Sequence, residues 1–405
     1  MHRGSVLALI LAGGEGGRLE VLTQERAKPA LPFAGAYRLI DFVLSNCVHS
    51  GIADVWVVQQ YEPHSLSDHL TNGRPWDLDR THGGLVVLHP HQGRSESGFY
   101  AGNADAIYRN KRELRDFGAE TLLVLSADHI YRLDLRALID AHTGSGADVT
   151  MVTTRVERAE ASRFGVVEIG ADDKVARFTY KPEEPEGDTV TTEVFAYRTE
   201  ALLDALDALA AEAGPGEDGE EPALSDFGDE LLRRFVEAGT ARAFELEGYW
   251  RDVGTIESYL RSHMELLEPE PALILDDRSW PILTASAQRP SARFAAGARV
   301  EASIVSSGSR IEGTVVHSVL APGVVVEAGA EVRDSILLED VVVRAGARVG
   351  CAILDSEVEV GAGARVGAEE GCSPETVVLV GQRARIDPGS RVEPGARVDP
   401  SAPDQ

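Results

Sequence analysis

The feature that most constrains the fold is a repeat in the last quarter of the chain. From Ala295 onward, single aliphatic residues recur every 17 residues, and they do so in three separate series. Three series with one shared period predict a hexapeptide-type parallel β-helix, a coil with three sides in which each side buries one aliphatic residue per turn. An ordinary β-sandwich would show alternation of period two, which this segment does not have. The series are Val315, Val332, Val349 and Val366; Val326, Val343 and Val360; and Leu320, Leu337 and Leu354, and Ile386, Val392 and Val398 continue a six-residue spacing.

The first part of the chain, up to about residue 265, alternates strand-like apolar runs with helical patterns. This alternation predicts an α/β fold with a mostly parallel sheet. An acidic segment rich in Gly and Pro, residues 211–226, predicts an exposed loop inserted within this domain. We therefore expect a catalytic domain over 1–268, a linker over 269–294 and a β-helix domain over 295–405. The clearest strands are 5–13, 54–61, 121–128 and 148–154, and the clearest helices are 105–118 and 135–146.

Charge and cysteine content narrow the function classes. The chain has 39 Lys and Arg and 66 Asp and Glu, which give a formal charge of −27. This negative charge repels nucleic-acid phosphate and anionic lipid. We expect no nucleic-acid or membrane partner. The apolar run from Val6 to Ala12 is too short to span a bilayer and lacks a signal-peptide cleavage pattern. Because the spacing of Cys47, Cys351 and Cys372 suggests neither a disulfide framework nor a zinc site, we predict a cytoplasmic protein.

A glycine cluster follows the first predicted strand, in the sequence GGEGGRL from Gly13 to Leu19. The dinucleotide fingerprint would need a third glycine at Leu19, and a Walker A loop would need Lys followed by Ser or Thr. Because neither motif fits, we interpret the cluster as another kind of nucleotide-binding loop, whose backbone N–H groups approach a phosphate chain. Arg18 and Lys28 are expected to flank a triphosphate and to neutralise the charge that builds on the leaving pyrophosphate.

Taken together, these segments resemble a known family. The sequence LAGGEGGRL followed by AKPALPFAGAYRLIDFVLSNCVHSGI resembles the nucleotide-binding signature of bacterial glucose-1-phosphate adenylyltransferases. The resemblance implies a Rossmann-like nucleotidyltransferase domain followed by a left-handed β-helix. It also implies transfer of a nucleotidyl group from an NTP to a sugar 1-phosphate, by in-line attack and with release of pyrophosphate. Further matches are QQYEPHSLSDHL (59–70), YAGNADAIY (100–108), SADHIYRLD (126–134), FGVVEI (164–169), SDFGDELL (225–232), YWRDVGTIESY (249–259) and WPI (280–282).

The resemblance also implies roles for single residues. Asp128 and Asp252 are the expected Mg²⁺ ligands, because a hard cation takes carboxylate oxygens together with substrate phosphates. Arg18, Lys28 and Asp128 are the expected catalytic residues. The expected nucleotide-binding residues are Leu11, Ala12, Gly13, Gly14, Gln92, Gly102 and Asn103, and the expected acceptor-binding residues are Tyr100, Gly165, Tyr180, Lys181, Glu193, Asp226 and Phe227.

Two departures from the family pattern fall on the acceptor side. Tyr180 stands where the family has the glutamate of Glu-Lys-Pro, and Glu193 stands where it has a glycine. Loss of a buried acceptor for a substrate hydroxyl costs ~1–3 kcal/mol. Two acceptors therefore remain open: glucose 1-phosphate with ATP, and a pseudosugar phosphate such as valienol 1-phosphate with GTP, as in a divergent branch of the family. Gly93, where glutamine or arginine is common, leaves the base open as well.

Two other classes of function were weighed against this one. A non-catalytic regulatory subunit is disfavoured because Arg18, Lys28, Asp128 and Asp252 are all present. A hexapeptide acyltransferase is disfavoured because His317 is the single histidine of the repeats and no acyl-donor loop is recognisable. Glu25 stands where some relatives carry an activator-binding lysine, so activation by a sugar bisphosphate is not implied. The resemblance implies a homo-oligomer, either a dimer or a tetramer.

Overall fold

The computed structural model describes residues 5–14, 16–90, 100–214, 224, 228, 230–368 and 371–402. The chain divides into two compact units. The first consists of residues 1–14, 42–63 and 70–250, and the second of residues 15–41, 64–69 and 251–405. Within the described ranges, no helix is both long enough and apolar enough to cross a bilayer.

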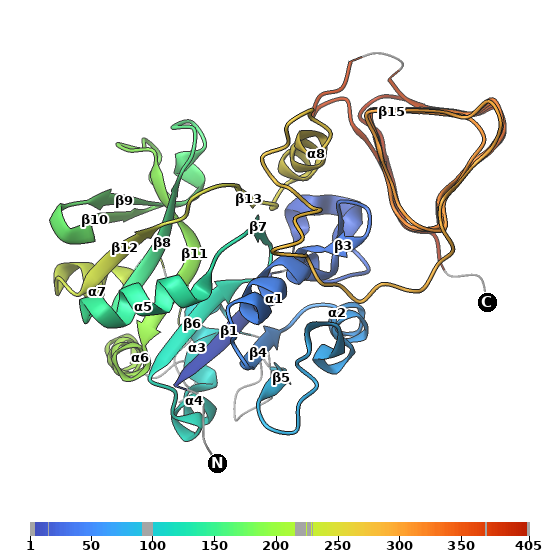
Figure 1. Ribbon diagram of the computed structural model, residues 1–405. Helices are drawn as coiled ribbons and strands as arrows, with labels where there is room; N and C mark the ends of the chain where they lie inside the picture. Colours follow the sequence, from blue (N-terminus) through green and yellow to red (C-terminus); the bar gives the residue numbers. More distant parts are fainter. Residues whose placement is uncertain are drawn as a thin grey trace. The chain divides into compact units, whose positions relative to one another are not determined.

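A nine-stranded mixed sheet forms the centre of the first unit (Figure 1). Its main path is β10-β9-β11-β6-β1-β4-β5, and β8 pairs with both β11 and β12. Strands β6, β1, β4 and β5 run parallel to one another, whereas β11 is antiparallel to β6, β8 and β9. The strands are β1 (Val6–Ala12), β4 (Asp54–Gln59), β5 (Gly84–Leu88), β6 (Thr121–Ser126), β8 (Val149–Arg155), β9 (Gly165–Ile169), β10 (Val175–Tyr180), β11 (Thr189–Arg198) and β12 (Ala241–Glu245).

Helices bury the apolar strand residues, so the predicted α/β fold is confirmed. Side chains of α3, α4, α6 and α7 share one hydrophobic core with β1, β6, β8 and β11, while α5 packs against β8, β11 and β12. Two further short pairs of strands are β2 (Pro32–Phe33) with β3 (Tyr37–Arg38), and β7 (His129–Tyr131) with β13 (Trp250–Asp252). The helices are α1 (Leu39–His49), α2 (Pro63–Leu70), α3 (Asn103–Arg109), α4 (Lys111–Phe117), α5 (Leu135–Ser145), α6 (Thr199–Ala213), α7 (Leu231–Glu237) and α8 (Ile256–Glu265).

One predicted helix is broken in two. The pattern over 105–118 predicts a continuous helix, but α3 and α4 are separated at Asn110. The amide of Asn110 donates to the carbonyl oxygen of Ala106 at 2.7 Å and to the hydroxyl of Tyr100 at 3.1 Å. A side chain that bonds the backbone in this way competes with the helical hydrogen bonds, which explains the break. The predicted loop over 211–226 begins at the end of α6, and most of it lies outside the described residues.

The C-terminal part of the second unit is the predicted left-handed β-helix, whose coils overlie one another as a triangle in Figure 1. Each of its three sheets has six parallel strands. All ten aliphatic residues of the three 17-residue series are buried, with at most 2% of any side chain exposed. One sheet is β14 (Arg293–Phe294), β17 (Arg310–Ile311), β20 (Val325–Val326), β23 (Val342–Val343), β26 (Glu359–Val360) and β29 (Arg385–Ile386); the second is β15 (Arg299–Glu301), β18 (Thr314–Val316), β21 (Glu331–Arg333), β24 (Arg348–Gly350), β27 (Arg365–Gly367) and β30 (Arg391–Val392); the third is β16 (Ile304–Val305), β19 (Val319–Leu320), β22 (Ile336–Leu337), β25 (Ala352–Leu354), β28 (Val378–Val380) and β31 (Arg397–Val398).

The last coil has its own pattern. Strands β29, β30 and β31 are two residues long, begin with arginine, and form the final strand of each sheet. A proline follows each strand after one further residue, at Pro388, Pro394 and Pro400.

The structure contradicts the expectation that the cysteines are unpaired. Cys351 and Cys372 form a disulfide, with Cα atoms 5.1 Å apart. The regular spacing hid this pairing, because Ile336 pairs with Ile353 one 17-residue coil later, whereas Ile353 pairs with Leu379. The longer connection carries Cys372 back to Cys351. Cysteine usage therefore no longer supports the prediction that the protein is cytoplasmic.

The segment that follows the glycine cluster packs against α8 and the β-helix within the second unit. The hydroxyl of Tyr259 donates to the carbonyl oxygen of Pro32 at 2.6 Å, and Nε2 of His263 accepts from the backbone N–H of Ala34 at 3.1 Å. Arg26 and Asp355 form a buried ion pair at 2.8 Å. The AKPALPF segment is therefore held on both sides by residues far away in sequence.

Candidate active site

The carboxyl ends of the central parallel strands form the first part of the site. Ala12 of β1 is opposite Gln59 of β4, and Leu11 is opposite Ser126 of β6. In open α/β sheets, ligands bind outside these strand ends. The glycine cluster starts directly after β1, so Gly13 and Gly14 lie at this edge.

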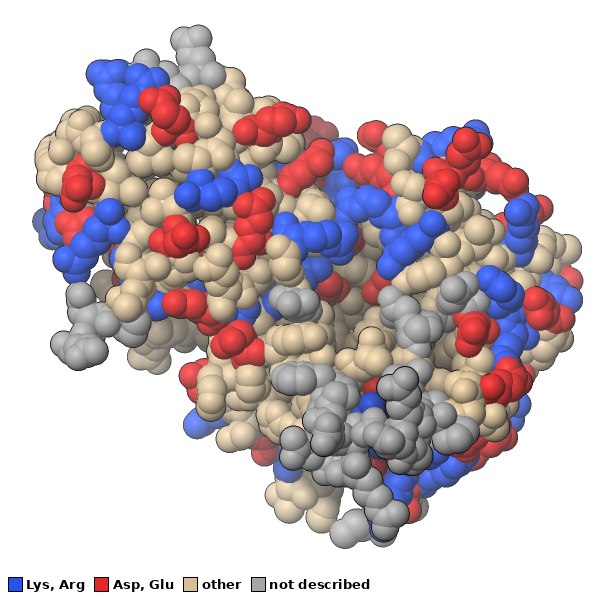
Figure 2. Space-filling model, turned by 180° about the vertical axis from the view of Figure 1, so that it is seen from behind, with Lys and Arg blue, Asp and Glu red and all other residues tan. Residues whose placement is uncertain are grey.

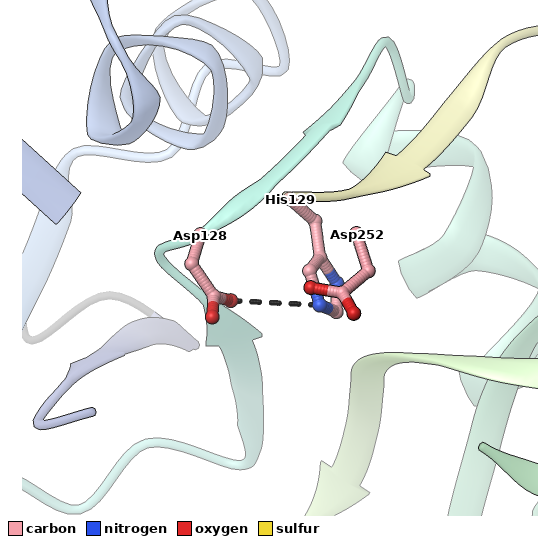
Figure 3. A group of neighbouring side chains, drawn as sticks. All are labelled: Asp128, His129 and Asp252. Atoms are coloured by element: carbon pink, nitrogen blue, oxygen red, sulfur yellow. Dashed lines mark ion pairs between the residues drawn. The ribbon is translucent and has the colours of Figure 1, made fainter. Parts of the chain in front are cut away.

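Asp128 lies in the short turn between β6 and β7. Its carboxylate accepts a hydrogen bond from the hydroxyl of Ser126 and lies 3.5 Å from Nε2 of His129, the ion pair dashed in Figure 3. Nδ1 of His129 contacts the carbonyl oxygen of Thr192 at 2.9 Å, which fixes the ring. Asp128 retains 23% of its side chain exposed and is therefore open to a ligand.

Aromatic rings connect this carboxylate to the predicted acceptor strand. Trp250 packs edge-on against His129 and against Phe164, with both ring centroids 5.2 Å away. Phe164 directly precedes Gly165, one of the predicted acceptor residues. His129 and Trp250 were missed as site residues by the sequence reasoning, although both lie inside motifs that it quoted.

The predicted acceptor residues Gly165, Tyr180 and Lys181 lie together. Tyr180 pairs with Gly165 across β10 and β9, and the Lys181 ammonium group donates to the Tyr180 hydroxyl at 2.7 Å. A Cβ at Gly165 would lie 2.6 Å from the ring of Phe178, so a larger residue here would have to displace that ring. The ring of Tyr180 occupies the space where a Cβ of Gly228 would stand, so the tyrosine lies directly against Gly228.

Glu193 lies at a β-bulge in β11. The pairing of β11 with β8 shifts register between Thr191 and Phe195, and Glu193 has a φ of 55°. This left-handed conformation favours glycine, and it costs other residues ~1 kcal/mol or more. The backbone thus keeps a glycine-like conformation although the residue is glutamate.

Tyr100, Gly102 and Asn103 form a separate corner of the first unit. The backbone N–H of Tyr100 donates to Oε1 of Gln60 at 2.6 Å, and Nε2 of Gln60 donates back to the Tyr100 carbonyl oxygen at 3.3 Å. Gly102 is the N-cap of α3, and Asn103 is its first residue. Gln60 therefore ties the end of β4 to the start of α3.

The second unit brings together Arg18, Lys28 and Asp252. The Lys28 ammonium group lies 3.7 Å from Oδ1 of Asp252, and both side chains are nearly buried. A Cβ at Gly254 would lie 2.9 Å from Oδ1 of Asp252 and 3.1 Å from Nη2 of Arg18, so Arg18 and Asp252 both lie against this glycine, and Lys28 lies next to Asp252. Asp252 is the last residue of β13.

Local turns place the two cations. Gly16 has a φ of 74° and accepts hydrogen bonds from the backbone of Leu19 at 2.8 Å and from the hydroxyl of Thr23 at 2.9 Å. These bonds close a 3₁₀ turn over Gly17–Thr23 that carries Arg18. Lys28 begins a second 3₁₀ turn, Lys28–Ala30, in which Pro29 sets the backbone. Gln92, Asp226 and Phe227, the remaining predicted site residues, lie outside the described residues.

The structure combines an α/β domain, which has a glycine cluster and carboxylates at its strand ends, with a hexapeptide β-helix. This combination defines a class of protein. Comparison with known families gives the same class. The Nucleotidyl transferase family matches residues 7–269, and the family described as GlmU-like, C-terminal hexapeptide, matches residues 290–376. The chain belongs to the Nucleotidyl transferase family.

Relatives in bacteria bear a more specific name. The chain is 43% identical over 333 residues to a glucose-1-phosphate adenylyltransferase of Thermotoga neapolitana, covering 82% of this chain and 77% of the relative. It is 44% identical over 309 residues to the enzyme of that name from Thermomicrobium roseum, covering 75% and 69%. The Bacillus cereus enzyme of that name is 40% identical over 331 residues, covering 81% and 86%. The family resemblance deduced from the motifs is thereby confirmed.

Proposed function

We propose that the protein joins an NTP, either ATP or GTP, to a sugar or sugar-like 1-phosphate, releasing pyrophosphate and giving an NDP-sugar. The observation that carries this proposal is that Asp252 lies near both Lys28 and, at Gly254, Arg18, in a chain matched by the Nucleotidyl transferase family. The resemblance to glucose-1-phosphate adenylyltransferases supports the acceptor class and a homo-oligomeric assembly, either a dimer or a tetramer.

The proposed chemistry is positioning and charge neutralisation. Arg18 is exposed and presents a planar guanidinium group to two phosphate oxygens, whereas nearly buried Lys28 acts as a point charge. Because Lys28 is held beside Asp252 before substrate binds, its ammonium group needs little reorganisation when charge develops on the leaving pyrophosphate.

Asp128 and Asp252 are the proposed Mg²⁺ ligands. Their donor atoms are carboxylate oxygens, the type that Mg²⁺ prefers. Each is also held by a neighbour, Asp128 by Ser126 and Asp252 by Lys28, which restricts the orientation of each carboxylate. Bound here, the metal would neutralise triphosphate charge.

Tyr180, Lys181 and Glu193 define the proposed acceptor pocket. The Tyr180 hydroxyl accepts from the Lys181 ammonium group and so orients the charge that would hold the acceptor phosphate. The glycine-like backbone at Glu193 carries a carboxylate that can accept hydrogen bonds from substrate hydroxyls. The altered acceptor pattern favours a substrate whose hydroxyls differ from those of glucose, with glucose 1-phosphate as the second candidate.

The decisive experiment measures pyrophosphate release for ATP and GTP against glucose 1-phosphate and cyclitol 1-phosphates. Lys181→Gln should raise the KM for the acceptor strongly and leave the KM for the NTP nearly unchanged, because only the acceptor phosphate loses a contact. Tyr180→Glu with Glu193→Gly should shift kcat/KM toward glucose 1-phosphate by about tenfold, the effect of ~1.4 kcal/mol. Exposed Lys174→Gln, elsewhere in the first unit, is the matched control.

A wild-type enzyme that prefers glucose 1-phosphate and ATP by orders of magnitude would refute the altered acceptor. Absence of pyrophosphate release with every pair would refute the transferase itself.

A further inference from the structure

Charged residues of the β-helix contact the segment that carries Arg18 and Lys28. One such residue comes from each of β22, β25, β28 and β31 or from the turn that follows it, and all the contacts lie within the second unit. On the face drawn in Figure 2, basic and acidic side chains are interspersed, and exposed ion pairs contribute little to stability. The four ion pairs are Arg38 with Glu339, Arg26 with Asp355, Glu25 with Arg383, and Glu20 with Arg397.

One of these four pairs is buried. The side chains of Arg26 and Asp355 are 8% and 2% exposed and lie 2.8 Å apart, whereas the side chains of the other three pairs are between 20% and 42% exposed. Removing one partner of a buried pair leaves a charge without compensation, so a buried pair restrains its two segments more firmly than an exposed pair does. The pair of Arg26 with Asp355 is therefore the strongest restraint of the four.

The carboxylate of Asp355 is itself held in place. Its Oδ1 accepts a hydrogen bond from the backbone N–H of Ser356 at 2.6 Å, and the hydroxyl of Ser356 donates to Oε2 of Glu339 at 3.0 Å. Glu339 and Ser356 are 17 residues apart in sequence, and they follow strands β22 and β25, which pair with each other. The stacking of these two coils thus sets the positions of both carboxylates.

Both sides of the turn that carries Lys28 are attached to these carboxylates. Arg26 precedes Lys28 by two residues, and Ala30 follows it by two. The guanidinium group of Arg38, which pairs with Glu339 at 3.3 Å, donates to the carbonyl oxygen of Ala30 at 2.6 Å. The 3₁₀ turn that begins at Lys28 connects the two attachments, so a shift of Arg26 changes the position of the lysine.

We propose that Asp355 is a positioning residue for nucleotidyl transfer, which acts through Arg26 on the placement of Lys28. This inference rests on the proposed function, in which the Lys28 ammonium group neutralises charge on the leaving pyrophosphate. Displacing a group that acts in the transition state lowers kcat, and it leaves the KM for the acceptor unchanged when that group does not contact the acceptor. The β-helix thereby contributes to catalysis, although Asp355 is not itself proposed to contact a substrate.

The first test compares pyrophosphate release by Asp355→Asn and by the wild type. The kcat should fall about tenfold or more, while the KM for the acceptor stays within about twofold, because the substitution leaves Arg26 unpaired and displaces the turn. Because Asp355 acts through Arg26, the double variant Arg26→Gln/Asp355→Asn should have the same kcat as Arg26→Gln alone. Effects that multiply in the double variant would overturn the proposal.

The second test follows Lys28 directly and does not need an active enzyme. Acylation by an N-hydroxysuccinimide ester, read by peptide mass spectrometry, should be at least about fivefold faster at Lys28 in Asp355→Asn than in the wild type, because a nearly buried amine reacts only after local opening. Exposed Lys174 is the internal reference and should react equally in both. Equal labelling of Lys28 would overturn the positioning role whether or not the wild type is active, whereas absence of pyrophosphate release from the wild type would refute the proposed function.

Two control variants separate positioning from a general loss of stability. Asp340→Asn removes a carboxylate that pairs with Arg289 at 2.6 Å in the same β-helix, and Val360→Ala removes buried methyl groups from its core. Val360→Ala should lower the unfolding temperature, but both controls should keep the kcat and the Lys28 labelling of the wild type. Losses of kcat in the controls as large as in Asp355→Asn would overturn the proposal.

Circular dichroism shows whether Asp355→Asn folds. If it does not, the double variant Arg26→Gln/Asp355→Asn replaces it in the labelling test, because it leaves no buried charge of this pair behind. Lys28 should again react faster than in the wild type, and equal rates would overturn the proposal.

Discussion

The β-helix depends on a repeated pattern of residues, whereas the carboxyl edge of the central sheet depends on single residues. In the β-helix, Val326, Val343 and Val360 occupy equivalent positions, and each is buried against its neighbours above and below. At the sheet edge, Asp128 and Glu193 lie outside any of the 17-residue series. The repeated residues of the β-helix therefore indicate which positions stabilise the fold. The residues of the sheet edge that belong to no repeat indicate which positions carry the chemistry. Substitutions should separate the two, with the β-helix losing stability and the sheet edge losing turnover.

The largest effect is expected inside the β-helix. Val343→Asp places a carboxyl group where the side chain is fully buried, and a pKa shift of several units there corresponds to about 4 kcal/mol of lost stability. Val325→Asp, on the outward side of the coil opposite Arg310, is the matched control and should cost little. Thermal unfolding measures both. Equal losses for the two variants would mean that the inward register is wrong.

The disulfide should have the next largest effect. Cys372→Ser opens a link that spans 21 residues, and loop entropy gives about 3 kcal/mol for a link of this length. A lowered midpoint of thermal unfolding, reproduced in the wild type by dithiothreitol, is the expected result. Cys47→Ser, at the free buried cysteine, is the control for loss of a thiol: it keeps the disulfide and should respond to dithiothreitol as the wild type does, whereas Cys372→Ser should not respond. Identical curves for wild type with and without reductant would contradict the bond.

The sheet edge should show the reverse behaviour. Asp128→Asn and Asp252→Asn should each lower turnover at least about a hundredfold, equivalent to ~2.7 kcal/mol, because Mg²⁺ and triphosphate placement weaken together. Their unfolding temperatures should stay close to that of the wild type. Exposed Asp116→Asn in α4 is the control. Near-normal pyrophosphate release at saturating Mg²⁺ would remove the substituted residue from the metal site.

A smaller, pH-dependent effect links stability to the segment near Lys28. Burial lowers the pKa of His263 from 6.5 to about 4, and Nε2 of His263 accepts from the N–H of Ala34 only when the ring is neutral. The folded pKa is below the unfolded value, so the stabilisation is present above pH 6.5 and is lost as the pH falls toward 4. Between pH 7.5 and 5 the loss should be about 2 kcal/mol in urea unfolding.

His263→Gln should be less stable at pH 7.5 and should show a flatter pH dependence. Burial also lowers the pKa of His142 in the first unit, so some dependence should remain. The same slope in wild type and variant would exclude His263 as its source.

Periodicity predicted the β-helix and its register because each inward position depends on its counterparts in the neighbouring coils. The main strands of the sheet were also predictable, since runs such as β6 are buried almost throughout. Asn110 was not, because its helix break depends on bonds to Ala106 and Tyr100 that no local propensity encodes. The sequence did not predict the disulfide between Cys351 and Cys372, because the pairing depends on one coil being longer than the others.

The candidate site was predictable only in part. The motifs indicated Arg18, Lys28 and Asp252, but that Asp252 lies near both cations is a property of the folded chain, because residues 18 and 28 are far from residue 252 in sequence. His129 and Trp250 are recognised only when their rings are seen in contact. The sequence could not show that Glu193 keeps a left-handed backbone, because backbone strain is a property of the folded bulge.

The strands of the last coil of the β-helix have features that disfavour the addition of another strand. Three sheets end there together, at β29, β30 and β31, and an exposed strand edge is a template on which another chain can add. Each of these strands is short and starts with a charged arginine, and a proline that cannot donate a hydrogen bond follows closely at Pro388, Pro394 or Pro400. Strands with these features are poor templates for the addition of a further strand.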